Sequence, residues 1–209
     1  MREHSPIRAA IFDLGGVVVN ICEQAIRRHW AGTLHLPPEQ LPDPFADDDR
    51  YQLLERGEMS IEEYYRHMVG RMGRAMSFED FLAGWNSLVV GPVAEMEPLL
   101  ARLKRSLRLL ALSNTNVAHA AVWRPMCAEA LRHFERVFVS YEMGLRKPAP
   151  ECFSRVLAYL GLRPGQVVFI DDSPAHVAAA RRVGMKGIVA QDPEQIAREL
   201  GRLGVELEV

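Results

Sequence analysis

The sequence predicts an α/β fold, in which a doubly wound, Rossmann-like parallel sheet carries a helical cap inserted after its first strand. From residue 91 onward, short continuous apolar runs alternate with amphipathic helical stretches, which is typical of parallel strands covered on both faces. Residues 20–90 contain helical patterns and no convincing strand. We therefore expect an α/β core formed by residues 1–19 and 91–209 and a helical cap formed by residues 20–90.

The five apolar runs predicted to be strands span residues 9–14, 107–114, 136–140, 166–172 and, with the weakest pattern, 186–190. Helical patterns lie between and after the later runs, over residues 92–105, 117–134, 150–162, 174–185 and 192–204. Ser173 and Asp192 are expected to be N-caps of the last two helices. Pro125 is expected to break or kink the helix that contains it.

Four further helical patterns make up the expected cap, over residues 22–34, 47–60, 60–72 and 77–89. Ser60 and Glu63 have the spacing of a capping box, and Ser77 begins its helix in a similar way. The segment LPPEQLPDPFADDD, residues 36–49, is rich in turn-forming residues and is expected to be a loop within the cap. Trp85 and its aromatic neighbours occur at helical spacing, which favours packing over contact with a substrate.

Composition and charge exclude several classes of protein. The 209 residues are 48% hydrophobic and 25% charged, and the formal net charge is -2, so the chain gives no electrostatic reason to bind nucleic acid or an anionic membrane. Its apolar runs have the length of strands, below the roughly 18 residues of a membrane span. The first residues resemble no signal peptide, and three scattered cysteines favour a reducing compartment. We expect a cytoplasmic protein.

Polar side chains lie where the predicted strands end. They are Asp13, Ser113, Asn114, Asp171 and Asp172, and Lys147 follows the strand over residues 136–140. The carboxyl ends of parallel strands meet at one edge of a sheet, where ligands bind. Converging carboxylates repel one another unless a cation lies between them, and hard oxygen ligands favour Mg²⁺. Hydroxyl, backbone N–H and ammonium donors would hold a phosphate, towards which a carboxylate can act as nucleophile.

Each of these residues also has a purely structural explanation. Asp13 or the pair Asp171 and Asp172 could begin a helix, the SNT run could form a turn, and Lys147 could be a solvated loop residue. Such explanations would have to hold at four strand ends together. We therefore favour one functional site that contains all of these residues.

Four segments, IFDLGGVVV, LSNTN, GLRKPAPECF and FIDDSPAHVAAAR, resemble motifs I to IV of the haloacid dehalogenase-like (HAD) hydrolase superfamily. They occur in the same order, and the resemblance covers essentially the whole chain. The Asp-Leu-Gly of the first motif is similar to a subgroup that includes bacterial phosphatases of sugar phosphates such as glucose 1-phosphate. The phosphatase lobe of soluble epoxide hydrolases is a more distant relative. ERGEMS and GWNSLV also resemble the cap of that subgroup.

The resemblance implies a Mg²⁺-dependent phosphomonoester hydrolase that acts through an aspartyl-phosphate on a small phosphorylated metabolite, expected to be a sugar phosphate. Asp13 would be the nucleophile and a Mg²⁺ ligand. Asp172 would be the second carboxylate on the metal, with Asp171 in support, and the backbone carbonyl of Gly15 would complete the protein ligands.

The resemblance also assigns the phosphate-binding groups. Ser113 and the backbone of Asn114 would hold phosphoryl oxygens, and Lys147 would neutralise those oxygens together with Asp13. The substrate itself and the oligomeric state do not follow from the sequence.

Gly15 departs from the pattern of most phosphatases in the superfamily, which carry Asp two residues after the nucleophile. That Asp protonates the leaving oxygen, and losing a general acid–base costs about 10²–10⁴ in rate. We expect a slower or more selective phosphatase, whose missing acid a cap residue such as Glu55, Glu58 or His67 could replace. A better leaving group, such as the anomeric oxygen of a sugar phosphate, would need less help.

Two alternative functions stay open. A 2-haloacid dehalogenase also uses an Asp nucleophile, but it needs no metal and typically lacks a pair such as Asp171 and Asp172. A catalytically weak scaffold that binds phosphorylated ligands or a protein partner would fit the missing side chain at Gly15.

Overall fold

The computed structural model describes residues 6–45 and 49–206 and contains a central sheet of five parallel strands in the order β5-β4-β1-β6-β7. The strands are β1 (Ala9–Phe12), β4 (Arg108–Ser113), β5 (Arg136–Val139), β6 (Val167–Asp171) and β7 (Lys186–Val189). All five coincide with predicted strands, and the α/β fold with a doubly wound sheet is confirmed. Because β1 lies between β4 and β6, the residues that follow these three strands become neighbours.

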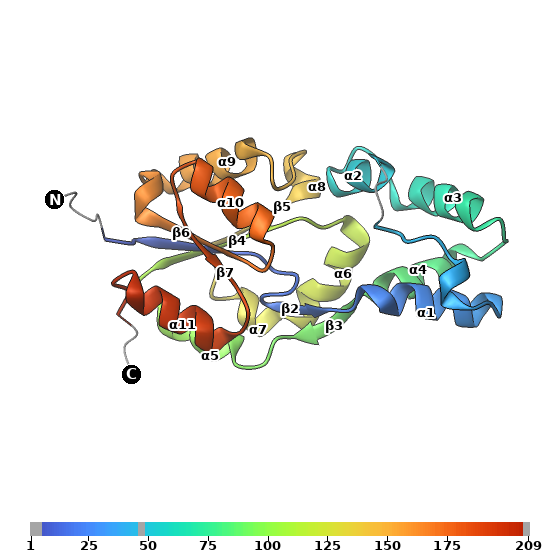
Figure 1. The fold of residues 1–209 in the computed structure, drawn as a ribbon, viewed down its shortest axis with the longest axis horizontal. Helices are drawn as coiled ribbons and strands as arrows, with labels where there is room; N and C mark the ends of the chain where they lie inside the picture. The colour runs from blue at the N-terminus through green and yellow to red at the C-terminus, as the bar shows by residue number, and fades with distance from the viewer. Residues whose placement is uncertain (1–5, 46–48, 207–209) are drawn as a thin grey trace.

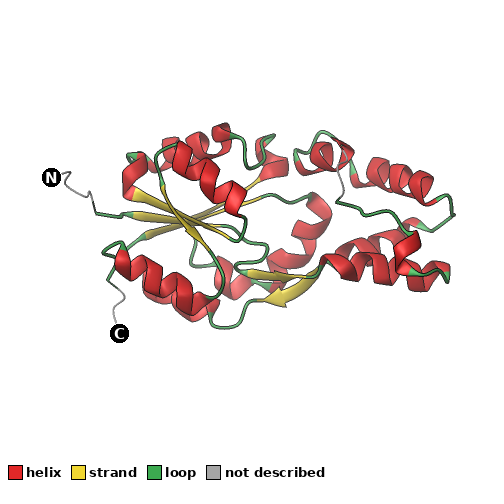
Figure 2. Ribbon diagram, viewed as in Figure 1, coloured by secondary structure: helices red, strands yellow, loops and turns green. Residues whose placement is uncertain are grey.

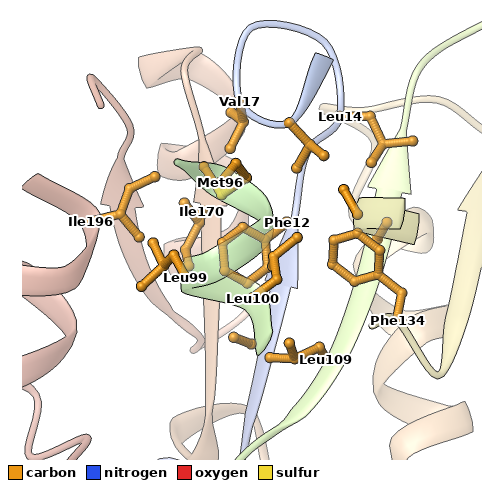
Figure 3. Close-up of a cluster of buried hydrophobic side chains, with 14 of the residues drawn as sticks. Phe12, Leu14, Val17, Met96, Leu99, Leu100, Leu109, Phe134, Ile170 and Ile196 are labelled. Atoms are coloured by element: carbon orange, nitrogen blue, oxygen red, sulfur yellow. The ribbon is translucent and has the colours of Figure 1, made fainter. Parts of the chain in front are cut away.

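The sheet is apolar on both faces because its strands alternate between two hydrophobic clusters. Ile11 belongs to the cluster on one face, whereas the adjacent Phe12 belongs to the cluster on the other. Figure 3 shows the second face, where Phe12 packs with Leu99 of a covering helix and with Phe134. The rings of Phe12 and Phe134 have centroids 5.9 Å apart. A strand buried on both sides holds the residues beyond its end in a fixed position.

Helices cover both faces of the sheet, as Figure 2 shows. One layer consists of α5 (Met96–Leu103), α6 (Val117–Met126), α7 (Ala128–Leu131) and α11 (Pro193–Arg202). The other consists of α9 (Pro150–Leu160) and α10 (Pro174–Arg182). Two short helices, α8 (Ser140–Met143) and η2 (Pro164–Gln166), lie in connections. The predicted break near Pro125 falls at Cys127, between α6 and α7.

Local capping sets where several helices begin. The side chains of Ser173 and Asp192 accept hydrogen bonds from the backbone N–H of His176 and Gln195, respectively. The capping box of Ser60 with Glu63 is present, as are the other expected caps. These caps agree with the sequence because they depend on neighbours three residues apart.

Residues between the first two sheet strands form a second group of helices beyond the carboxyl ends of the sheet (Figure 1). They are α1 (Glu23–Leu34), η1 (Pro38–Gln40), α2 (Asp49–Glu55), α3 (Ile61–Met72) and α4 (Phe78–Asn86). We call α1 to α4 the helical insert. It has its own hydrophobic cluster, in which the buried ring of Trp85 stacks against Trp30 and Phe81. Trp85 therefore packs inside the insert, as its spacing predicted.

A short antiparallel ribbon joins the insert to the sheet and was not predicted. It pairs β2 (Val19–Ile21) with β3 (Val89–Pro92). Runs of three and four residues are too short for a periodicity to be recognised, and each strand needs a partner some 70 residues away. Residues 46–48 of the predicted loop and helix lie outside the described residues. Within residues 6–45 and 49–206, no helix is long and apolar enough to cross a membrane.

Candidate active site

A pocket of about 340 Å³ lies at the carboxyl ends of the strands and has walls from both the sheet and the helical insert. The core contributes Asp13, Gly15, Ser113, Asn114, Arg146, Asp172 and His176, among others. The insert contributes Glu23, Phe45, Tyr51 and Glu55. Five of the predicted site residues therefore line one pocket, and the other two, Lys147 and Asp171, are buried directly behind it.

Lys147 is the centre of a buried ionic cluster. Its Nζ lies 2.9 Å from Oδ2 of Asp13 and 2.6 Å from Oδ2 of Asp171. Asp13 follows β1 and Asp171 ends β6, and these strands are adjacent in the sheet. A fully buried ammonium is tolerated only when paired and hydrogen-bonded, so the two carboxylates hold Lys147 in place and share its charge.

Asn114 holds the backbone of Lys147 from both sides. Its Oδ1 accepts a hydrogen bond from Lys147 N at 2.8 Å, and its Nδ2 donates to Lys147 O at 2.9 Å. The sequence suggested a role for the Asn114 backbone, whereas the structure gives its side chain a positioning contact. The adjacent Ser113 is buried at the end of β4, and both residues line the pocket.

His176 is a member of the site that sequence reasoning missed. Its Nδ1 lies 3.1 Å from each carboxylate oxygen of Asp171, and Ser173 N donates to Asp171 Oδ1 at 2.8 Å. Ligand atoms of Asp13, Asp171 and His176 all lie within 4.8 Å of one another. The N-cap at Ser173 could have indicated this, because it places His176 in the first turn of α10, beside the end of β6.

Gly15 and Gly16 differ in whether their backbone can accept a side chain. A Cβ on Gly16 would lie 2.2 Å from Oδ2 of Asp172, and its φ of +76° is left-handed, so glycine is required there. A Cβ on Gly15 would lie 3.6 Å from Ile21 Cδ1, an ordinary contact, and its φ is not left-handed. The backbone at Gly15 therefore accepts a side chain, and no steric reason requires glycine.

The carboxylates of the site outnumber the positive charges that face them. Burial raises the pKa of Asp13 to about 8, although Lys147 opposes the shift. Burial and then the charge of Asp171 also raise the pKa of Asp172. Burial also acts to raise the pKa of Asp171. The interactions with Lys147 and His176 are stronger and hold the pKa of Asp171 below the usual range. One ammonium thus does not compensate three carboxylates.

This donor set fits a hard divalent cation. Three carboxylates and one ammonium leave a formal charge of two negative units, and carboxylate oxygens are the ligands that Mg²⁺ favours. Asp13 and Asp172 both line the pocket, so a cation there is open to a ligand. The metal-ligating chemistry expected from the sequence therefore fits the residues present.

Of the three cap residues considered as a replacement acid, the structure brings only Glu55 to the pocket. Its Oε2 accepts from Arg146 Nε at 2.7 Å, and its Oε1 accepts from Tyr51 OH at 2.8 Å. Glu58 instead forms an exposed ion pair with Arg56. His67 lines a separate hollow on the insert.

A second polar contact joins the insert to the core at the wall of the pocket, where His119 lies. The ring of His119, in α6, stacks on Trp85 with centroids 4.7 Å apart, and its Nε2 lies 3.0 Å from Trp85 O. Asn116 caps α6 and places its Nδ2 3.0 Å from His119 Nδ1. An amide nitrogen can only donate, so His119 is neutral, with its proton on Nε2. Burial correspondingly lowers the pKa of His119 to about 4.

Comparisons with known proteins agree with this geometry. The chain is 23% identical to D-ribitol-5-phosphate phosphatase of Bacteroides thetaiotaomicron over 199 residues, which cover 93% of this chain and 97% of that protein. It is 26% identical to sesquiterpene phosphatase astK of Aspergillus oryzae, with 94% and 96% covered. A solved HAD family enzyme of B. thetaiotaomicron, in complex with magnesium and inorganic phosphate, matches with a TM-score of 0.76 and 27% identity, covering 89% of this chain and 95% of that one.

The family model described as "haloacid dehalogenase-like hydrolase" matches residues 7–184, a range that includes every predicted site residue. The matched region begins just before β1 and ends after α10. With the parallel sheet, the buried lysine between two carboxylates and the helical insert after the first strand, the chain belongs to the haloacid dehalogenase-like hydrolase family, and it is a hydrolase.

Proposed function

We propose that this protein is a Mg²⁺-dependent phosphomonoesterase that acts through an aspartyl-phosphate on Asp13, with a small sugar or polyol phosphate as substrate. The observation that carries the proposal is the buried Lys147 between Asp13 and Asp171, 2.9 and 2.6 Å from their oxygens, at the floor of a pocket. Two relatives matched over nearly their whole length are named phosphatases, and one of them is named for a phosphorylated polyol.

In the proposed mechanism Asp13 is the nucleophile. Its carboxylate oxygen bonds to phosphorus while the bond to the leaving oxygen breaks, and water then hydrolyses the acyl phosphate and restores Asp13. Ser113 and the backbone of Asn114 bind phosphoryl oxygens, and Lys147 neutralises them. Asn114 keeps Lys147 in position through its two hydrogen bonds to the lysine backbone.

Mg²⁺ would be held by Asp13, Asp172 and the carbonyl of Gly15, with Asp171 and His176 beside them. When bound, the ion neutralises charge on the phosphoryl group. Burial raises the pKa of Asp13 although Lys147 opposes the shift, so a bound cation would favour the charged carboxylate that attacks phosphorus.

The leaving oxygen receives no proton from position 15, where Gly15 has no side chain. Glu55 is a poor substitute, because its two carboxylate oxygens already accept hydrogen bonds from Arg146 and Tyr51. We infer that the proton comes from water or from the substrate. The enzyme should therefore depend strongly on the acidity of the leaving group.

We propose that residues 20–90 are the cap of the enzyme and that residues 1–19 and 91–209 are its core. The separate hydrophobic cluster of the helical insert supports this division, as do the pocket walls that Phe45, Tyr51 and Glu55 supply. A cap in this position would exclude water from the acyl phosphate and select the substrate.

The deciding experiment is a phosphate-release screen of sugar, polyol and aryl phosphates with Mg²⁺, repeated in excess EDTA. We expect turnover that requires the metal and is lost in Asp172→Ala. Beryllium fluoride, a mimic of the acyl phosphate, should inhibit. Full activity of Asp172→Ala in EDTA would contradict the mechanism, and chloride release from a 2-haloacid without metal would identify the dehalogenase alternative.

A further inference from the structure

An ion pair with a buried carboxylate joins the helical insert to the core at the wall of the pocket, and the proposed phosphoryl transfer does not use it. Glu55, at the end of α2, is only 3% exposed. It accepts hydrogen bonds from Arg146 Nε at 2.7 Å and from Tyr51 OH at 2.8 Å. Arg146 immediately precedes Lys147, so this pair lies next to the catalytic cluster in the chain and lines the same pocket.

Arg146 keeps donors available to a molecule in the pocket. A guanidinium has five N–H groups, and among the described residues its hydrogen-bond partner is Glu55 alone, through Nε. The side chain of Arg146 is 26% exposed and lines the pocket. Tyr51 and Glu55 hold the guanidinium at a fixed orientation, which favours recognition of a solute of defined shape.

The charge of Arg146 is already compensated by Glu55. The other charged side chains of the pocket wall are the carboxylates of Asp13, Glu23 and Asp172, and His176 also lines the wall, with its Nδ1 3.1 Å from both carboxylate oxygens of Asp171. Lys147 is shared between two carboxylates and, in the proposed function, serves the phosphoryl group. A second anionic group on the substrate would find no uncompensated cation and would lie close to carboxylates. Hydroxyl groups would find both donors and acceptors at no cost in charge.

The rest of the wall suits a compact carbon skeleton. It includes the apolar side chains of Val19, Ile21, Phe45, Leu88, Val89 and Trp123, together with polar side chains of Thr115, His119 and Ser173. At about 340 Å³ the pocket is at the small end for a ligand site. A molecule that presents both hydroxyl groups and C–H groups matches a wall that carries polar and apolar side chains.

We propose that the Glu55–Arg146 pair is the specificity element of the pocket, and that it selects phosphate esters whose remaining part carries hydroxyl groups and no second anionic group. This inference rests on the phosphatase function proposed above. Glu55 then cancels the charge of the Arg146 guanidinium. This role differs from that of a residue that only holds the insert against the core.

The test compares kcat/KM for sorbitol 6-phosphate and 6-phosphogluconate, which differ only in a hydroxymethyl group and a carboxylate at one end. We expect the parent enzyme to prefer the polyol ester by about tenfold or more, the typical effect of one charge-assisted contact. Glu55→Gln keeps oxygen and shape but removes the charge, so the ratio should fall by about tenfold. Glu58→Gln removes a carboxylate from an exposed pair in the same segment and should leave the ratio unchanged.

Arg146→Gln provides an independent arm and covers the case in which Glu55→Gln does not fold. It leaves the carboxylate without its partner, so the ratio should move the other way, further towards the polyol ester. Equal changes for both substrates in both variants would make the pair merely structural and overturn the inference, while the phosphatase function would stand. No phosphate release from these esters or from p-nitrophenyl phosphate with Mg²⁺ would overturn both.

Discussion

Two ionic clusters at the pocket contain similar charges but are assembled in different ways. Lys147 pairs with Asp13 and Asp171, which follow neighbouring strands of one parallel sheet. Arg146 pairs with Glu55, which lies 91 residues earlier in the chain, in the helical insert. The first cluster exists wherever the sheet is formed. The second exists only when the insert packs on the core, and both of its residues line the pocket between them.

The same contrast holds for the hydrophobic clusters. The sheet buries strands on both faces, whereas the insert packs Trp30, Phe81 and Trp85 against one another and meets the core through His119. Changes in the sheet-end cluster should therefore act on chemistry, and changes in the insert should act on stability and on fit. Four experiments test this distinction.

The largest effect is expected for Asp13→Asn. The amide is nearly isosteric but is not a nucleophile, so turnover of p-nitrophenyl phosphate should fall by more than about 10³-fold, while the melting temperature stays close to that of the parent. Asp192→Asn changes a carboxylate of the N-cap of α11 in the same way and should keep full activity. If Asp13→Asn retained more than a few per cent of the activity, direct attack by water would replace the covalent mechanism.

Trp85→Ala should act on stability. Removing a buried indole typically costs about 3–5 kcal/mol of unfolding free energy, and this ring stacks on two other aromatic residues of the insert. Urea unfolding measures the loss. Glu135→Gln, which breaks the exposed pair with Arg108, should cost less than about 1 kcal/mol. Equal losses in the two variants would show that the insert does not depend on its aromatic cluster.

Gly15→Asp should repair the missing acid, because the backbone accepts a side chain there. The parent should cleave p-nitrophenyl phosphate far faster than a simple alkyl phosphate, since the phenolate leaves without a proton. A carboxyl group that reaches the leaving oxygen should narrow that gap by up to about 10²-fold. Comparing two substrates in two proteins isolates the effect. If the parent already cleaves both esters equally fast, another residue supplies the proton.

The smallest effect concerns pH. Burial lowers the pKa of His119 to about 4 in the folded protein, below its ordinary 6.5. As pH falls below 6.5 the unfolded chain binds a proton that the folded chain does not, so stability is lost down to about pH 4. Linkage puts the loss at about 2 kcal/mol at pH 5. His119→Gln has no histidine at this position. Between pH 8 and pH 5 its unfolding free energy should therefore fall by about 2 kcal/mol less than that of the parent protein. Identical losses would contradict a buried neutral histidine.

Local patterns in the sequence predicted much of the fold. The strand ends with Asp13, Ser113 and Asp171 were predicted because continuous apolar runs indicate buried parallel strands, and Ser60, Ser173 and Asp192 were predicted as caps from short spacings. The ribbon of β2 and β3 was missed because its strands are short and their pairing is distant. The roles of the proposed site residues stay predictions until the variants are measured.

The polar groups at the ends of the strands follow from the sequence, because apolar runs and their order along the chain place them there. The side chains that face these groups follow from tertiary packing. It selected Glu55 over Glu58 and His67, brought His176 to Asp171, and turned the Asn114 amide onto the Lys147 backbone. The physical reason is that such contacts depend on how the insert packs against the core and how side chains pack within it. No local pattern encodes a hydrogen bond between residues 91 positions apart.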